Sequence, residues 1–269
     1  MGSETRPVVP ILLYHAVTTD PGSHIAPFAV PPAEFERHLD AVAGSGATAV
    51  TFGELVDGDP LAAGGPLVAI TFDDGYADFA RSALPALRGR SLPSTLFVTT
   101  GWLAGGRSRE PGPTDPMLDW SQLPELLAEG VELGAHSHSH PQMDTLAAAA
   151  LREELVRPKQ ELEQALGREV DLFAYPHGYH GPRVRRATRA AGYRAAAAVR
   201  NALHRPGGEP FAVARLTVTR TTTAGDVARW LRGVGVPVAG PGESPATRGW
   251  RIYRRARAVL RRAPGSDYR

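Results

Sequence analysis

Short apolar segments alternate along this chain with longer amphipathic ones. Eight apolar or β-branched runs predict strands at residues 8–14, 47–52, 66–70, 94–100, 131–135, 170–175, 194–199 and 211–218. Apolar positions at helical spacing predict helices at 32–43, 76–88, 121–129, 145–166, 184–191 and 226–231. We expect Thr145 to cap the longest of these helices, Gly167 to end it, and Pro158 to kink or divide it. Alternating strands and helices favour an α/β fold with a parallel sheet covered by helices.

Polar side chains fall at the carboxyl ends of several predicted strands. They are His15, the pair Asp73 and Asp74, His136, and the segment Tyr175-Pro176-His177. A parallel barrel brings those strand ends to one face, where barrel enzymes keep their active sites. The placement therefore favours a (β/α) barrel of about seven or eight parallel strands over a doubly wound sheet.

Two adjacent carboxylates, Asp73 and Asp74, end the third strand and are followed by Gly75. Side chains alternate along a strand, so the two carboxylates serve different neighbours, and the glycine lets the backbone turn away at once. An ordinary strand-ending turn has the same sequence signature.

Three histidines within five residues, His136, His138 and His140, follow the fifth strand. Such tracts are typical of metal sites, and the alternative is a solvated His-rich loop. One Asp and two His supply three ligands and leave a fourth position open, which is the pattern of a catalytic zinc site. The remaining Asp is then free to act as a base, as in a hydrolase.

Composition sets broad limits. The chain has 269 residues and 42% apolar content, enough for one large α/β domain or two small ones. The 28 acids against 30 Lys and Arg indicate no nucleic-acid partner, and the absence of Cys excludes disulfides and thiolate ligands. Residues 1–10 do not resemble a signal peptide, and no run is long enough to cross a membrane, so we expect a cytoplasmic protein.

The C-terminal region differs from the rest. Residues 234–247 are rich in Gly, Pro, Val and Ser and predict a linker. Beyond it, an apolar stripe at helical spacing is surrounded by seven arginines; the stripe is Trp250, Tyr253, Ala256, Val259 and Leu260, and the arginines are Arg248, Arg251, Arg254, Arg255, Arg257, Arg261 and Arg262. Such a helix can lie on an anionic membrane as a peripheral contact, or dock on its own domain; both remain open.

The motifs TFDDG at 71–75 and HSxxH at 136–140 resemble those of the polysaccharide deacetylases, the NodB-homology (carbohydrate esterase 4) family. Weaker matches follow in the family's order: ILLYH at 11–15, FAYPHG at 173–178 and FAVARL at 211–216. The resemblance implies a distorted, incomplete (β/α) barrel over residues 7–235, with residues 236–269 as a linker and basic helix.

The resemblance also implies roles for residues. It assigns Asp74, His136 and His140 to a divalent metal, most simply Zn²⁺, and Asp73 to the general base. The backbone N–H of His177 would hold the oxyanion, with Tyr175 and Pro176 beside the substrate. His138 is at a position that varies in the family, and we expect it to be solvated.

Two departures from the family pattern concern a base-orienting arginine and a late Leu-x-His motif. No arginine lies shortly before Pro176, where residues 172–174 are Leu, Phe and Ala. Arg215 could substitute from the last strand, beside the substrate, or be a surface or structural residue. His204 lacks the spacing of the late motif, so the resemblance points to His15 as proton donor.

Together these features predict a metal-dependent N-deacetylase acting on an N-acetylated amino sugar, N-acetylglucosamine in a glycan. Relatives with a Tyr-His first strand often act on exopolysaccharide, while peptidoglycan, chitin-like oligomers and small sugars stay open. The alternatives are a hydrolase of a non-sugar amide and a catalytically inactive glycan-binding protein.

Overall fold

The fold was analysed in a computed structural model, which describes residues 8–58, 64–106, 112–240, 242 and 245–261. Its eight parallel strands are β1 (Ile11–Tyr14), β2 (Thr48–Val50), β3 (Leu67–Phe72), β4 (Thr95–Val98), β5 (Glu132–Ala135), β6 (Leu172–Ala174), β7 (Ala195–Val199) and β8 (Val213–Thr217). All eight predicted strands are therefore present, most of them shorter than their apolar runs. The structured part of each run is the part that pairs with a neighbouring strand.

Seven of the strands form a closed ring, and β2 is an additional strand beside β3. The order is β1-β8-β7-β6-β5-β4-β3-β2, and a further pairing of β1 with β3 closes the barrel. This pairing extends from Ile11↔Ala69 to Tyr14↔Phe72. The β5–β6 pairing is a single residue pair, Ala135↔Phe173, so the barrel is closed but distorted. The barrel fold predicted from the sequence is confirmed.

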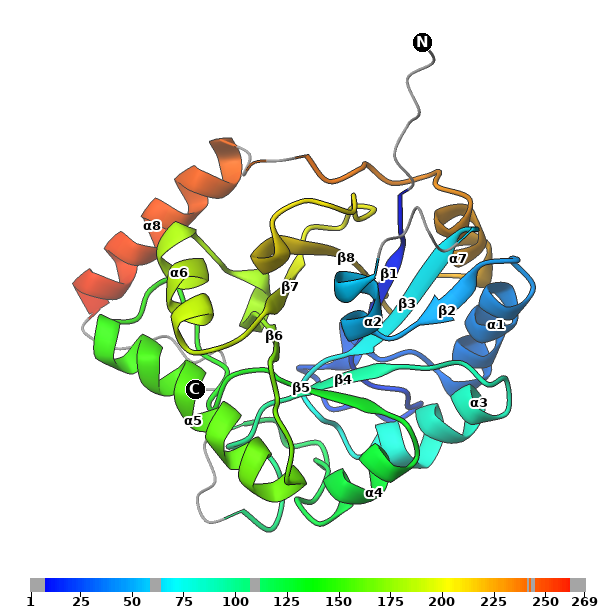
Figure 1. Ribbon diagram of the computed structural model, residues 1–269, viewed down its shortest axis with the longest axis horizontal. Coiled ribbons are helices and arrows are strands. Elements are labelled where there is room, and N and C mark those ends of the chain that lie inside the picture. The colour runs from blue at the N-terminus through cyan, green and yellow to red at the C-terminus, as the bar shows by residue number, and fades with distance from the viewer. Residues whose placement is uncertain (1–7, 59–63, 107–111, 241, 243–244, 262–269) are drawn as a thin grey trace.

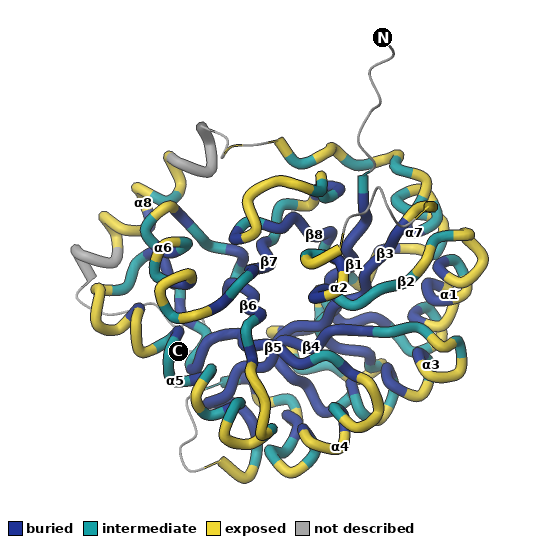
Figure 2. The backbone as a smooth tube through the Cα atoms, in the orientation of Figure 1, coloured by how far each residue is buried: buried dark blue, intermediate teal, exposed yellow. Residues whose placement is uncertain are grey.

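Helices surround the barrel, as Figure 1 shows. They are α1 (Pro32–Ala43), α2 (Phe52–Asp57), α3 (Leu84–Arg88) after a π-helical turn (Phe79–Ala83), α4 (Gln122–Ala128), α5 (Ala148–Leu166), α6 (Pro182–Ala190), α7 (Ala224–Leu231) and α8 (Pro245–Arg261). Short 3-10 turns occur at Ala26–Phe28, Pro176–Gly178 and Pro210–Ala212. Figure 2 shows the buried strands at the centre and the exposed residues on the outer faces of the helices.

Strand alternation separates the barrel interior from the layer under the helices. The interior below the site contains an apolar cluster that includes Ile11, Ala69 and Phe97, with Phe52 of α2 packed against them. Residues two positions further along each strand face the same side. The alternation that buries the apolar residues therefore also turns the polar residues at the strand ends towards one pocket.

Two expectations about α5 need correction. Thr145 does not cap the helix: its hydroxyl donates to the Gln142 carbonyl, and the helix begins at Ala148. Pro158 does not divide the helix, which runs without a break from Ala148 to Leu166. Gly167 ends it in a left-handed conformation (φ 65°), as predicted.

The predicted linker and C-terminal helix are close to the barrel domain. Within the linker, Val238 pairs with Leu203 as an isolated bridge. The terminal helix α8 contacts the domain through Arg254, whose guanidinium lies 2.5 Å from Asp144. Side chains are described only for residues 249–257 of α8, so those of Arg248, Val259, Leu260, Arg261 and Arg262 lie outside the described part.

Candidate active site

A pocket of about 240 Å³ opens at the carboxyl ends of the strands. Its walls combine strand ends with the loop before α1: Leu13, His15, His24, Ile25, Phe28, Asp73, Asp74, His136, His140, His177, Val199 and Thr217. The pocket thus brings together His15, both aspartates, His136, His140 and His177, as the barrel prediction requires. Tyr175, Pro176 and Arg215 lie elsewhere.

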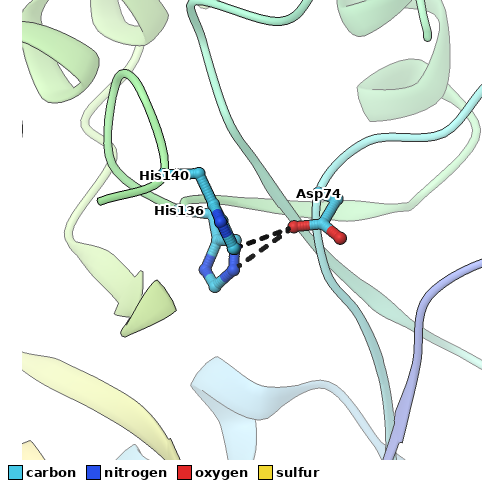
Figure 3. A group of neighbouring side chains, drawn as sticks. All are labelled: Asp74, His136 and His140. Carbon is cyan, nitrogen blue, oxygen red and sulfur yellow. Dashed lines mark ion pairs between the residues drawn. The ribbon is translucent and has the colours of Figure 1, made fainter. Parts of the chain in front are cut away.

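Asp74, His136 and His140 form a cluster suited to one cation (Figure 3). One potential ligand atom from each residue lies within 4.8 Å of the other two. Oδ1 of Asp74 is 3.5 Å from Nε2 of His136 and 3.4 Å from Nε2 of His140. This oxygen is buried and accepts no hydrogen bond from the described residues, a costly state unless a cation or donor occupies the space in front of it.

The protonation states of this cluster fit the same interpretation. Nδ1 of His136 donates to the Ala174 carbonyl at 2.8 Å, which leaves its Nε2 lone pair facing Asp74. Burial lowers the pKa of His136 to about 4 and that of His140 well below its usual value. Burial and the charge of Asp73 raise the pKa of Asp74 well above its usual value. A bound cation would offset that cost by favouring the ionised carboxylate.

The backbone at the site is held in an unusual conformation. Asp74, Ser137, His140 and His177 have φ between 57° and 75°, the left-handed region that non-glycine residues rarely adopt. Each such residue carries strain, which tends to collect at functional sites. The left-handed turn at Asp74 explains how two consecutive aspartates can both line one pocket.

Asp73 is fixed by an arginine from β8, which is separated from β3 only by β1. Both guanidinium nitrogens of Arg215 donate to the two Asp73 oxygens at 2.7 Å, and Arg215 also contacts the Thr71 hydroxyl at 3.2 Å. Both partners are buried, with Arg215 fully so. Burial acts to raise the pKa of Asp73, but the charge and hydrogen bonds of Arg215, together with the charges of His136 and His15, outweigh it and the pKa is lowered. Arg215 is therefore beneath the carboxylate, where it orients Asp73, and it is not positioned to touch a substrate.

The loop that carries His136 and His140 is fastened to α5. Glu154 accepts hydrogen bonds from the backbone N–H groups of His138 and Ser139, both at 2.9 Å, and from the Ser139 hydroxyl at 2.5 Å. His138 is buried, and its Nδ1 lies 3.2 Å from Glu161. The expectation that His138 is solvated is wrong. The left-handed conformation of Ser137 (φ 65°) interrupts the strand alternation, and the His138 ring lies against α5 instead of lining the pocket.

His15 extends from the end of β1 into the pocket, with the Phe28 ring 5.1 Å away. Burial lowers the pKa of His15 to about 4, and the negative charge of Asp73 opposes that effect. His204, the alternative donor, pairs through its backbone with Val9 and lines a different cavity. His24 and Trp102 were not predicted: His24 lines the pocket, and the Trp102 ring lies 4.7 Å from that of His140.

The segment after β6 contributes one residue to the pocket. His177 lines it and contacts the His140 ring at 4.5 Å. Tyr175 is buried on the outer side of the strand, where its hydroxyl donates to the Phe211 carbonyl. Its predicted contact with the substrate needs correction, because the alternation that turns Ala174 inward turns Tyr175 outward. Pro176 is also buried, and it begins the turn that carries His177.

A closed parallel barrel with an Asp/His/His cluster and an Arg-bound aspartate at its carboxyl end defines a barrel protein with a candidate metal-dependent active site. The chain belongs to the polysaccharide deacetylase family, whose family model matches residues 62–196, half of the chain. The matched region contains both aspartates and all three histidines of the HSxxH segment.

Individual proteins agree with this assignment. YxkH of Bacillus subtilis (strain 168) is 25% identical over 187 residues, 69% of this chain and 62% of its own length. IcaB from Ammonifex degensii is 28% identical with a TM-score of 0.69, covering 84% of this chain and 97% of that one. PplD of Streptococcus pyogenes, at 20% identity, shares the fold with a TM-score of 0.72 over 83% of this chain and 97% of its own.

Proposed function

We propose that this protein is a metal-dependent N-deacetylase that hydrolyses the acetamide of an N-acetylated amino sugar, N-acetylglucosamine in a glycan. The observation that carries the proposal is the pairing of two differently held aspartates in one pocket. The ion pair with Arg215 keeps Asp73 ionised, and Asp73 is not part of the ligand cluster. Asp74, in contrast, faces two neutral imidazoles. One carboxylate is thus available as a base and the other as a ligand.

Zn²⁺ is the metal we propose. Two imidazoles and one carboxylate are ligands that zinc accepts, and three protein ligands with an open position are typical of its catalytic sites. When bound, the metal would lower the pKa of a water molecule and polarise the acetyl carbonyl. Asp74, His136 and His140 would hold it.

Asp73 would remove the proton from the attacking water. Its pKa is lowered, so it is ionised and able to accept a proton at neutral pH, and Arg215 keeps it oriented. The backbone N–H of His177, in the turn after Pro176, is proposed to donate to the oxyanion.

His15 is proposed to protonate the departing amine. Because its pKa is lowered to about 4, the ring is neutral at pH 7 and must first take up a proton during turnover. The proton that Asp73 takes from the attacking water is available for this step. The negative charge of Asp73 favours a protonated His15 and therefore favours transfer of that proton to the His15 ring.

A hydrolase of a non-sugar amide would use the same residues, so only substrate tests can distinguish it from a sugar N-deacetylase. A catalytically inactive glycan-binding protein would not need Asp73 to be held by a buried arginine pair. That pair is expensive to bury and serves no ligand in the cluster, which favours an active enzyme.

The test is an acetate-release assay on metal-stripped protein with Zn²⁺, Co²⁺ or Mg²⁺ added back. The substrates are chitin oligomers, peptidoglycan fragments, an N-acetylglucosamine exopolysaccharide, free N-acetylglucosamine and an N-acetyl-lysine peptide. We expect release from a glycan that depends on added metal, no release by Asp73→Asn with metal retained, and lost metal in His136→Ala and His140→Ala. Release from the peptide alone would support the amide alternative. Glycan binding without release by the metal-loaded protein would identify an inactive binder.

A further inference from the structure

The exposed large apolar side chains of the described residues are concentrated on α8. Trp250, Ile252 and Tyr253 are 55%, 68% and 51% exposed, and the others, Val234 and Val238, lie in the segment before the helix. Single exposed apolar residues are common, but three within four positions of one helix are not explained by chance exposure. This group indicates a contact surface.

The orientation of α8 is the reverse of an ordinary amphipathic helix. Its domain-facing side is cationic: Arg254 is buried, its guanidinium pairs with Asp144 and lies 3.6 Å from the centre of the Tyr179 ring. Arg251, one turn earlier, packs close to Gly181. The interactions of these arginines fix the helix on the domain and leave Trp250, Ile252 and Tyr253 exposed.

The exposed residues of α8 are both aromatic and basic. The rings of Trp250 and Tyr253 are stacked 5.2 Å apart at 20°, and Arg255 and Arg257 are exposed on the same helix. Residues 245–261 include no Asp or Glu, so no negative charge of α8 offsets these arginines. We name Trp250, Ile252, Tyr253, Arg255 and Arg257 the α8 surface.

We propose that the α8 surface docks on an anionic lipid bilayer. Trp and Tyr favour the boundary between headgroups and acyl chains, aliphatic side chains such as Ile252 insert just below it, and arginines bind acidic headgroups. This combination of charge and apolar area matches a lipid surface better than a protein partner, for which an exposed apolar face would be paired with specific polar groups. Within the described residues no helix is long and apolar enough to span a bilayer, so the contact would be peripheral.

Docking would also place the pocket near the membrane. The Tyr179 ring under Arg254 lies 5.4 Å from that of His177, which lines the pocket, and Asp144 follows the histidine loop. Resting on the proposed function, this inference narrows the substrate to glycans held at a membrane, such as lipid-linked or nascent chains.

The test is co-sedimentation of the full-length protein with vesicles of phosphatidylcholine alone or with one third phosphatidylglycerol. We expect binding only to the anionic vesicles, weakened at least tenfold by Arg255→Gln/Arg257→Gln and by 0.5 M salt, and lost in Trp250→Ser/Ile252→Ser/Tyr253→Ser. The control Val234→Ser/Val238→Ser alters the other exposed apolar residues and should bind as wild type. Thermal unfolding of each variant confirms that it is folded.

Equal binding by wild type and the triple serine variant would overturn the proposal, as would equal binding to both vesicle types. Absence of vesicle binding together with self-association that the triple variant abolishes would also overturn it, and would assign the surface to a second copy of the chain. Acetate release from soluble oligomers is measured separately. Vesicle binding without acetate release would leave the α8 surface intact and refute only the proposed function.

Discussion

The buried pair of Arg215 and Asp73 offers the sharpest test of how the site is built. Replacing Arg215 by Met removes two hydrogen bonds of 2.7 Å and leaves the Asp73 charge buried without its partner. Breaking a buried ion pair on one side costs about 3–5 kcal/mol of unfolding free energy. We expect a loss of that size for metal-stripped Arg215→Met at pH 7, measured by urea denaturation.

The loss should depend on pH with a definite sign. In the wild type the pKa of Asp73 is lowered, so its contribution to stability is present above the usual carboxyl pKa and disappears as pH falls through the folded value. Without Arg215, burial is opposed only by the charges of His136 and His15, and we expect the pKa of Asp73 to rise. The difference in stability between wild type and variant should therefore be largest at neutral pH and shrink as Asp73 takes up a proton in acid. The acid limb of the rate profile should move to higher pH for the same reason.

Two controls separate the buried charge from simple loss of an arginine. Arg88→Met breaks an exposed pair with Glu129 and should change stability by less than about 1 kcal/mol. Asp73→Asn in the Arg215→Met background removes the stranded charge and should recover part of the lost stability. A loss below about 1 kcal/mol in Arg215→Met, with an unmoved acid limb, would show that Arg215 does not hold Asp73.

Two further substitutions test the proton donor and the histidine loop. His15→Ala should lower kcat at least about a hundredfold while metal content stays stoichiometric, whereas His204→Ala, in another cavity, should not; the reverse result would relocate the donor. Glu154→Ala removes the acceptor for two N–H groups of the loop and should weaken Zn²⁺ affinity about 10–100-fold in a chelator competition, while Glu153→Ala, exposed on the same helix, should leave it unchanged.

The barrel and the cluster could be predicted because both depend on local pattern. The spacing of the apolar residues indicates where the strands are and which side chains face inward. The same alternation continues to His15, Asp73 and His136 at the strand ends. Boundaries were less accurate, as at Ala148, where no polar cap marks the helix start. A cap could not be inferred there because the loop before α5 uses Thr145 for a bond of its own.

Contacts between segments that are distant in the chain could not be predicted from the sequence. Arg215 and Asp73 are 142 positions apart, and nothing local distinguishes a buried arginine on a strand from a surface one. Trp102 packs on His140 from the end of β4, yet in sequence it is one apolar residue in a Gly-rich stretch. His138 was expected to be solvated because its position varies in the family that the sequence resembles, and only the position of Glu161 on α5 reveals its buried partner.

The left-handed residues show why such long-range contacts are needed at this site. Asp74, Ser137 and His140 would relax towards ordinary conformations, at roughly 1–3 kcal/mol each, if nothing opposed it. The segment that follows β4 prevents this relaxation. The Thr99 N–H donates to the Asp74 carbonyl, and the Thr100 N–H donates to the Ser137 carbonyl. One segment thus holds both ligand-bearing turns, and Glu154 secures the second from the outside. Folding therefore orders the three ligand residues before a metal binds, and binding does not have to supply that conformational entropy. Metal affinity should fall when any of these hydrogen bonds is removed.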